Sequence, residues 1–259
     1  MKFKTFIVAI AAVCCTSCVG VTDKAMEMAD SIMDKTITRT IEEGEFNKFY
    51  DISNFNSIDA EGFCHIIYTQ SENYSVKVST NYAELLDALK ADKSGKKLKL
   101  KMKKKQSLNM DDPFINVYVK APVINKLELA GACGMTCDKM AVDSDLEISV
   151  SGAGSIQLGT VECKSLKINA SGAIKMAGTY LVKNDVNWES SGAAILDVNI
   201  TADKIRFENS GAVKMDAKVD CNKLKAINSG AGVMNLKGKA KKTEFEKAGA
   251  SRINTDGLN

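Results

Sequence analysis

The chain has 259 residues, which is enough for one large domain or two small ones. Its 45% hydrophobic content supports a packed core and excludes wholesale disorder. Thirty-five basic residues stand against 32 acidic ones, so the overall charge gives no reason to expect a nucleic acid partner. The single histidine, His65, excludes mechanisms that need two imidazoles, and we expect it to point outward and to act alone.

The N-terminal residues have the pattern of a secretory signal. Two lysines precede a short apolar run, which is about half of the ~20 residues that a bilayer-spanning helix needs. The tripeptide Thr-Ser-Cys that ends at Cys18 resembles the bacterial lipoprotein box, although Cys15 stands where an aliphatic residue is usual. We therefore predict a signal peptide over residues 1–17, a lipid anchor on Cys18 and a tether over residues 18–35. A simple secreted protein cut nearby is the alternative.

A tripeptide of a small residue, glycine and alanine recurs through the second half at intervals of 19–21 residues. Apolar and polar residues alternate with period two on both sides of it, which is typical of strands. Each unit therefore predicts a strand, a tight glycine corner, a second strand and a turn. Stacking such units in register would bury one continuous core. The tripeptides are centred on Gly131, Gly152, Gly172, Gly192, Gly211, Gly230 and Gly249.

The repeat predicts a right-handed parallel β-solenoid with coils of about 20 residues, and a two-sheet β-sandwich is the alternative. An earlier copy at Gly62 leaves an excursion between two coils at about residues 71–122. Within it we expect strands near residues 74–80, 96–105 and 114–120, and a short helix or turn near residues 82–90. No Pro/Gly/Ser linker separates a second domain, so we predict one domain over residues 36–259. The chain stops soon after the last repeat, which would leave a strand edge open to a second copy.

Three features together resemble a known family. They are the segments FNSIDAEGFCHIIYTQSENYSVKVST and INVYVKAPVINKLELAGA and the repeated SGA corners. In this order they resemble the head GIN domain family, adhesins of the bacterial cell envelope, over about four-fifths of the chain. The resemblance implies a β-helical fold and an envelope location, and it brings no established catalytic residues. We therefore expect a non-enzymatic outer-membrane lipoprotein, without cofactor or metal, that binds a glycan or another envelope component.

The lysine-rich segment KKLKLKMKKK offers one binding candidate. Alternation places Lys97, Lys99, Lys101 and Lys103 on one face of a strand. They predict a basic stripe for anionic polysaccharide, lipopolysaccharide or phospholipid headgroups. The competing interpretation is a half-buried strand whose solvent face or edge is protected by lysine. Aromatic residues that would stack on nucleobases are missing from the segment, which argues against nucleic acid.

Two cysteines have a special relation in the repeat. Cys64 and Cys133 both stand two residues after their glycines. Directly stacked coils would bring their Cα atoms to about 4.8 Å, which is within disulfide reach. The sequence is compatible with a disulfide between them and with a pair of buried reduced thiols. Cys133 and Cys137 lie about 13 Å apart along an extended strand, too far to share a metal ion.

Catalysis would have to use a pair of carboxylates. Asp197 and Asp216 share the position five after the glycine, and adjacent coils would separate them by about 5 Å, near the spacing of retaining glycosidases. They are the best candidates for the rival hypothesis, a carbohydrate-active β-helix enzyme. A solvated face is the other interpretation, because both should project from a regular surface. Trp188 occupies a core position and is expected to pack rather than to hold a sugar. A self-associating envelope scaffold is the third hypothesis.

Overall fold

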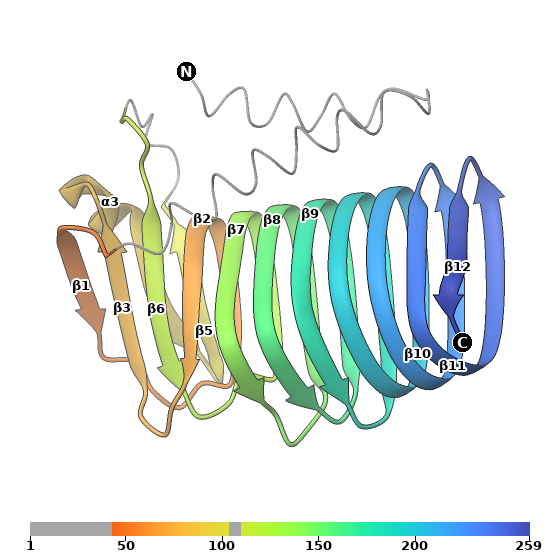
Figure 1. Cartoon of the computed structure of the whole chain (residues 1–259). Coiled ribbons are helices and arrows are strands. Elements are labelled where there is room, and N and C mark those ends of the chain that lie inside the picture. The colour runs from red at the N-terminus through yellow and green to blue at the C-terminus, as the bar shows by residue number, and fades with distance from the viewer. Residues whose placement is uncertain (1–42, 104–109) are drawn as a thin grey trace.

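The computed structural model describes residues 43–103 and 110–259, and the predicted signal peptide, Cys18 and the tether lie outside these ranges. The described residues form a β-solenoid of about seven turns, as predicted (Figure 1). Its elements are β1 Phe46–Tyr50, β2 Ser57–Gln70, β3 Ser75–Thr80, α3 Ala83–Ala88, β4 Leu89–Ser94, β5 Lys97–Met102, β6 Ile115–Ala121, β7 Lys126–Ala141, β8 Leu146–Cys163, β9 Leu166–Val182, β10 Asp185–Gly230, β11 Val233–Gly249 and β12 Arg252–Leu258.

Successive coils pair in parallel and in the register that the repeat predicts. Strands β7, β8, β9, β10 and β11 follow one another in the sheet order, and Gly131 stacks on Gly62 just as Gly249 stacks on Gly230. The extended conformation continues through the corners, which is why β10 alone runs for 46 residues. This parallel pairing excludes the sandwich alternative, whose strands would be antiparallel.

The core is a continuous column of apolar side chains between the two walls of the solenoid. Trp188 is fully buried in it, and its ring lies edge-on to that of Tyr180, with the ring centroids 5.9 Å apart. The indole N–H donates a hydrogen bond of 3.0 Å to the hydroxyl of Ser190. Trp188 is therefore a packing residue, as its position in the repeat predicts.

The excursion folds back onto the first coil. Strands β5 and β6 pair in parallel with the two halves of β2, on the side away from β7. Strand β4 then pairs antiparallel with β5, β3 pairs antiparallel with β6, and β1 pairs antiparallel with β3. The inserted residues thus cover the N-terminal end of the solenoid (Figure 1). The predicted strands and short helix are present, whereas β4 had not been expected as a separate strand.

The C-terminal end of the solenoid is only partly covered. Strand β12 pairs with β11 from Val233 to Gly238, and Ala240 donates its N–H to the carbonyl of Asn259. Beyond Ala240, no strand of the described chain pairs with the outer edge of β11. Within residues 43–103 and 110–259, the solenoid therefore has one covered end and one end where a strand edge is open.

Candidate functional site

The predicted lysine stripe lies on β5 and on Lys103, which directly follows it, and carboxylates lie beside the stripe. The ammonium group of Lys97 contacts the carboxylates of Glu128 and, at 3.5 Å, Asp59. Lys101 pairs with Glu61 at 2.7 Å. The hydrogen bond from Lys97 lowers the pKa of Glu128 below its ordinary value, and the same contact raises the pKa of Lys97. These contacts neutralise part of the stripe.

Lys99 and Lys103 are exposed, and neither forms an ion pair with another residue of the described chain. Lys99 stands in register with Asp59 of β2 on one side and Asp92 of β4 on the other. Two of the four lysines are therefore held by carboxylates, and a third lies between acidic strand positions. Anion binding by this stripe stays a prediction.

Cys64 and Cys133 lie in register on adjacent coils, as the repeat predicts. Their Sγ atoms are 3.9 Å apart, and both are buried free thiols. The hydrogen bond between them raises the pKa of Cys64 and lowers that of Cys133. The pair has the stacking that a disulfide would need, and whether it oxidises in the envelope stays a prediction.

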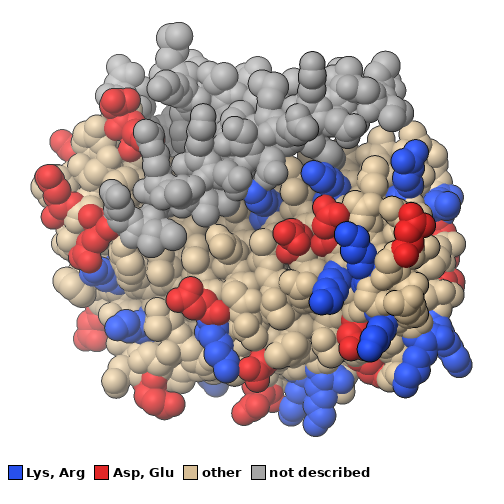
Figure 2. Space-filling view, in the orientation of Figure 1, with Lys and Arg blue, Asp and Glu red and all other residues tan. Residues whose placement is uncertain are grey.

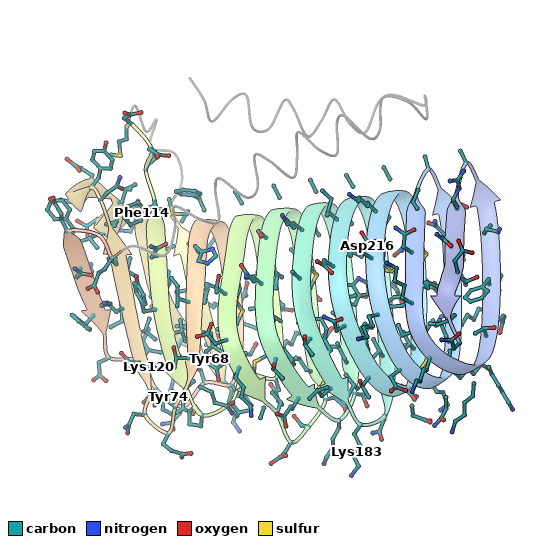
Figure 3. All side chains as sticks on the ribbon, in the orientation of Figure 1. Tyr68, Tyr74, Phe114, Lys120, Lys183 and Asp216 are labelled. Carbon is teal, nitrogen blue, oxygen red and sulfur yellow. The ribbon has the colours of Figure 1, made fainter. Side chains whose placement is uncertain are left out.

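Asp197 and Asp216, the candidates for catalysis, are both exposed side chains of β10. Figure 3 labels Asp216. The carboxylate of Asp216 accepts a hydrogen bond of 2.8 Å from the side-chain amide of Asn235 on the next coil. Among the described residues, no group of three or more His, Cys, Asp or Glu side chains is placed to hold a metal ion. The two carboxylates thus belong to a regular, hydrogen-bonded surface.

His65 is where the sequence prediction is wrong. Instead of pointing freely outward, its side chain is 7% exposed. Its Nε2 lies 2.7 Å from the hydroxyl of Thr136. Its ring lies against Gly134 on the next coil, and a side chain at position 134 would clash with the ring. Burial lowers the pKa of His65 to about 4, so the ring is neutral at pH 7.

A groove of about 520 Å³ runs along the outside of the solenoid beside the glycine corners; we call it the corner groove. It is lined by residues one to three positions before the glycines, and it crosses successive coils. Carboxylates from Asp59, Glu128, Glu189 and Glu208 lie along it. The serine that precedes the glycine contributes a hydroxyl on each of several adjacent coils: Ser151, Ser171, Ser191, Ser210 and Ser229.

Ion pairs and hydrogen bonds hold part of this lining in place. Arg206 contacts Glu208, and Lys126 contacts Glu128 at 3.3 Å. Ser229 donates a hydrogen bond of 3.2 Å to the carbonyl of Asn209. Such a repeated row of hydroxyl and carboxylate oxygens can hydrogen-bond a hydroxyl-rich ligand at several successive coils.

A second distinct surface lies at the open end. We call it the basic end, and it consists of six exposed lysines, none of which forms an ion pair within residues 43–103 and 110–259. Register places Lys237 directly over Lys218 and Lys242 directly over Lys223. Basic side chains gather at this end in Figure 2. The six residues are Lys218, Lys223, Lys237, Lys239, Lys241 and Lys242.

Most of the chain matches a family model of known proteins. Residues 54–184 and 180–259 match the family model described as "Putative auto-transporter adhesin, head GIN domain". The chain belongs to this head GIN domain family. No curated protein sequence matches it. No helix among the described residues of this head GIN domain protein is long and apolar enough to cross a membrane.

Solved structures share the fold of this head GIN domain protein. A putative adhesin from Bacteroides fragilis is 18% identical, with a TM-score of 0.70 over 81% of this chain and 95% of that one. A putative adhesin from Parabacteroides merdae is 16% identical, with a TM-score of 0.54 over 82% and 98%. A putative lipid binding protein from Parabacteroides distasonis is 18% identical, with a TM-score of 0.52 over 83% and 99%.

Sequence reasoning missed both surfaces of this head GIN domain protein. The serines before the glycines were visible as a column, but the groove beside them depends on how the wall curves at the corner. The basic end had a direct signal. Residues 214–252 contain ten basic and four acidic side chains, a net charge of +6, whereas the whole chain carries +3. Charge counted by segment would have found it.

Proposed function

We propose that this protein is a lipid-anchored adhesin of the bacterial outer membrane that binds polysaccharide without catalysing a reaction. Membership of an adhesin family supports a role at the cell envelope. The lipobox ending at Cys18 supports attachment to the membrane through a lipid. Adhesion and envelope location follow the family, whereas the anchor, the membrane and the ligand class are our proposal.

The corner groove is the observation that supports polysaccharide as the ligand. Polysaccharides present many hydroxyls at regular intervals, and the groove offers hydroxyl and carboxylate oxygens on successive coils. Glu128, one of the acidic groups in it, is better suited to accept hydrogen bonds than to donate a proton. A glycosidase general acid needs a raised pKa, whereas the pKa of Glu128 is lowered by its hydrogen bond from Lys97.

A matched pair of double variants tests the groove. In the mature chain carrying Cys18→Ser, the double change Ser171→Leu/Ser191→Leu removes two stacked hydroxyls and narrows the groove. Thr179→Leu/Asn199→Leu changes a stacked pair in the same two coils, outside the groove. On a polysaccharide array and on whole-envelope fractions, we expect the first variant to lose binding by about tenfold or more, the loss of two to three hydrogen bonds. The second should bind like the parent.

The same samples decide against the proposal in two ways. If the parent binds neither polysaccharide nor envelope material, the adhesin function is wrong. If shortened sugar products accumulate and the Asp197→Asn/Asp216→Asn variant abolishes them, the protein is an enzyme.

Attachment is tested separately: Cys18→Ser should release the protein from the membrane fraction and remove a metabolically incorporated fatty acid label. Retention of both in the variant would eliminate the anchor.

A further inference from the structure

We infer that the basic end binds an acidic polysaccharide. This inference rests on the proposed polysaccharide-binding function but not on the corner groove, whose carboxylates would repel the same ligand. It also moves anion binding away from β5, where Lys97 and Lys101 already contact carboxylates of neighbouring strands. The six lysines of the basic end have no such partners within the described chain.

Stacking at the basic end differs from stacking elsewhere in the solenoid. On earlier coils, some lysines contact an acidic residue of the next coil: Lys126 contacts Glu147 at 3.1 Å, and Lys139 contacts Glu162 at 3.2 Å. At two positions of the basic end, lysine stacks on lysine across a spacing of about 4.8 Å between coils. Like charges so placed repel each other, and an anionic ligand that bridges them would relieve the repulsion.

The acidic residues of this region form no ion pair with the six lysines of the basic end within the described chain. Glu244 and Glu246 both contact Lys225, the latter at 2.6 Å, and Asp216 accepts a hydrogen bond from Asn235. Asp220 stands in register with Lys239 without an ion pair between them. With +6 on residues 214–252, the remainder of the chain carries −3, so the charge is concentrated at one end.

Protection of an edge strand explains only part of this cluster. Lysines on an exposed edge prevent unwanted pairing, and Lys241 and Lys242 lie on the open edge of β11. Lys218 and Lys223 lie on the part of β10 that pairs with β11, from Lys214 to Gly230, and this part has no open edge. Lys237 and Lys239 lie on the part of β11 that β12 and Asn259 cover. Edge protection therefore does not account for four of the six lysines.

The surroundings favour an acidic polysaccharide over other polyanions. Single-stranded nucleic acid binding relies on aromatic platforms, and the only aromatic residue within residues 214–252, Phe245, is half-buried on the inward side. A membrane surface would favour apolar side chains that insert among lipids. Val233 is the only large apolar side chain in this segment that is prominently exposed. A flexible chain of carboxylates can follow lysines that are spread along a strand and across two coils.

The test compares polygalacturonate with its methyl ester, which has the same backbone without the charge. The variant Lys237→Gln/Lys239→Gln/Lys241→Gln/Lys242→Gln removes four charges from the basic end. Its matched control, Lys97→Gln/Lys99→Gln/Lys101→Gln/Lys103→Gln, removes the same charge from β5. At low salt we expect the parent and the control to bind polygalacturonate, and the basic-end variant to bind about tenfold or more weakly. A higher salt concentration should weaken the binding of polygalacturonate by the parent protein.

The remaining outcomes of this experiment either support or overturn the assignment of an acidic polysaccharide to the basic end. Equal losses in both quadruple variants would mean that total charge governs binding, which overturns the located site. Parental binding to phosphatidylglycerol–phosphatidylcholine vesicles but not to polygalacturonate would assign the basic end to membranes and overturn the inference. Loss of the acidic ligand with unchanged binding of a neutral polysaccharide supports it. If no polysaccharide binds at all, the proposed function fails together with the inference.

Discussion

At the scale of single residues, the environment of His65 has a consequence for stability. The ring is buried and bonded to Thr136, and its pKa falls to about 4. In the unfolded chain the imidazole titrates near its ordinary pKa of about 6.5. Between these two values the unfolded state binds more protons than the folded state. The stabilising contribution is therefore complete above about pH 6.5 and is lost as the pH falls toward about 4.

We predict that His65 makes the free energy of unfolding fall by roughly 2–3 kcal/mol between pH 6.5 and pH 4, because its pKa in the folded protein lies about 2.5 below that in the unfolded chain. Urea unfolding at intermediate pH values measures it. In His65→Gln, which has no group that titrates in this range, the decline should be shallower by that amount. Identical pH profiles for the two proteins would show that His65 is not buried as a neutral ring.

At the scale of the element, the glycine corner sets the geometry of each coil. Gly192 has a φ of +96°, and a Cβ on it would lie 2.5 Å from the carbonyl oxygen of Gly172 in the coil below. Both features exclude a side chain. The first is a backbone conformation that L-residues avoid, and the second is a contact with a backbone atom that neighbouring coils hold in place.

We therefore predict that Gly192→Ala destabilises the protein by more than about 3 kcal/mol, since it combines backbone strain with a backbone clash. Gly95, in the turn between β4 and β5, is the control. It has a φ of +60°, but a Cβ there meets no atom within 4 Å. Gly95→Ala should cost about 1–2 kcal/mol. Denaturant unfolding of both variants gives the comparison, and equal losses would mean that the close stacking of the corners is unimportant.

These corners also explain how much the sequence could predict. Glycines at a fixed interval and period-two alternation determine the register, so the stacking of Gly131 on Gly62 followed directly. The position two before the glycine shows the limit. It is apolar in the early coils and becomes Ser190, Asn209 and Asn228 later, yet all three are buried. Alternation alone cannot tell whether such polar residues face the core.

The functional surfaces were harder to predict for a related reason. A stripe such as Lys97 to Lys103 is visible in one strand, but the carboxylates that meet it come from β2 and β7, which are brought alongside only by the fold. The burial of His65 likewise depends on the neighbouring coil. Alternation along one strand shows which side chains share a face. The residues that contact them belong to other strands, and the sequence alone does not show which residues those are.

At the scale of the whole molecule, the two ends of the solenoid differ. The N-terminal end is covered by the excursion, whose β5 and β6 pair with β2. At the C-terminal end, no other described strand pairs with the edge of β11 beyond Ala240. Lys247 occupies the position two before Gly249, where the preceding coils bury Asn209 and Asn228. A charged residue at an inward position of an edge strand opposes pairing with a second copy.

We predict that the protein is monomeric at micromolar concentration and that Lys247→Val makes it associate through this edge. The change replaces a charge that would be buried between two copies with a side chain that both could bury. Lys218→Val is the control, because it makes the same substitution on an outward position of a coil that is already paired. Size-exclusion chromatography with light scattering should show dimers or larger species for Lys247→Val alone. Association of the unaltered protein would instead mean that Lys247 does not guard the edge, and it would favour the scaffold hypothesis.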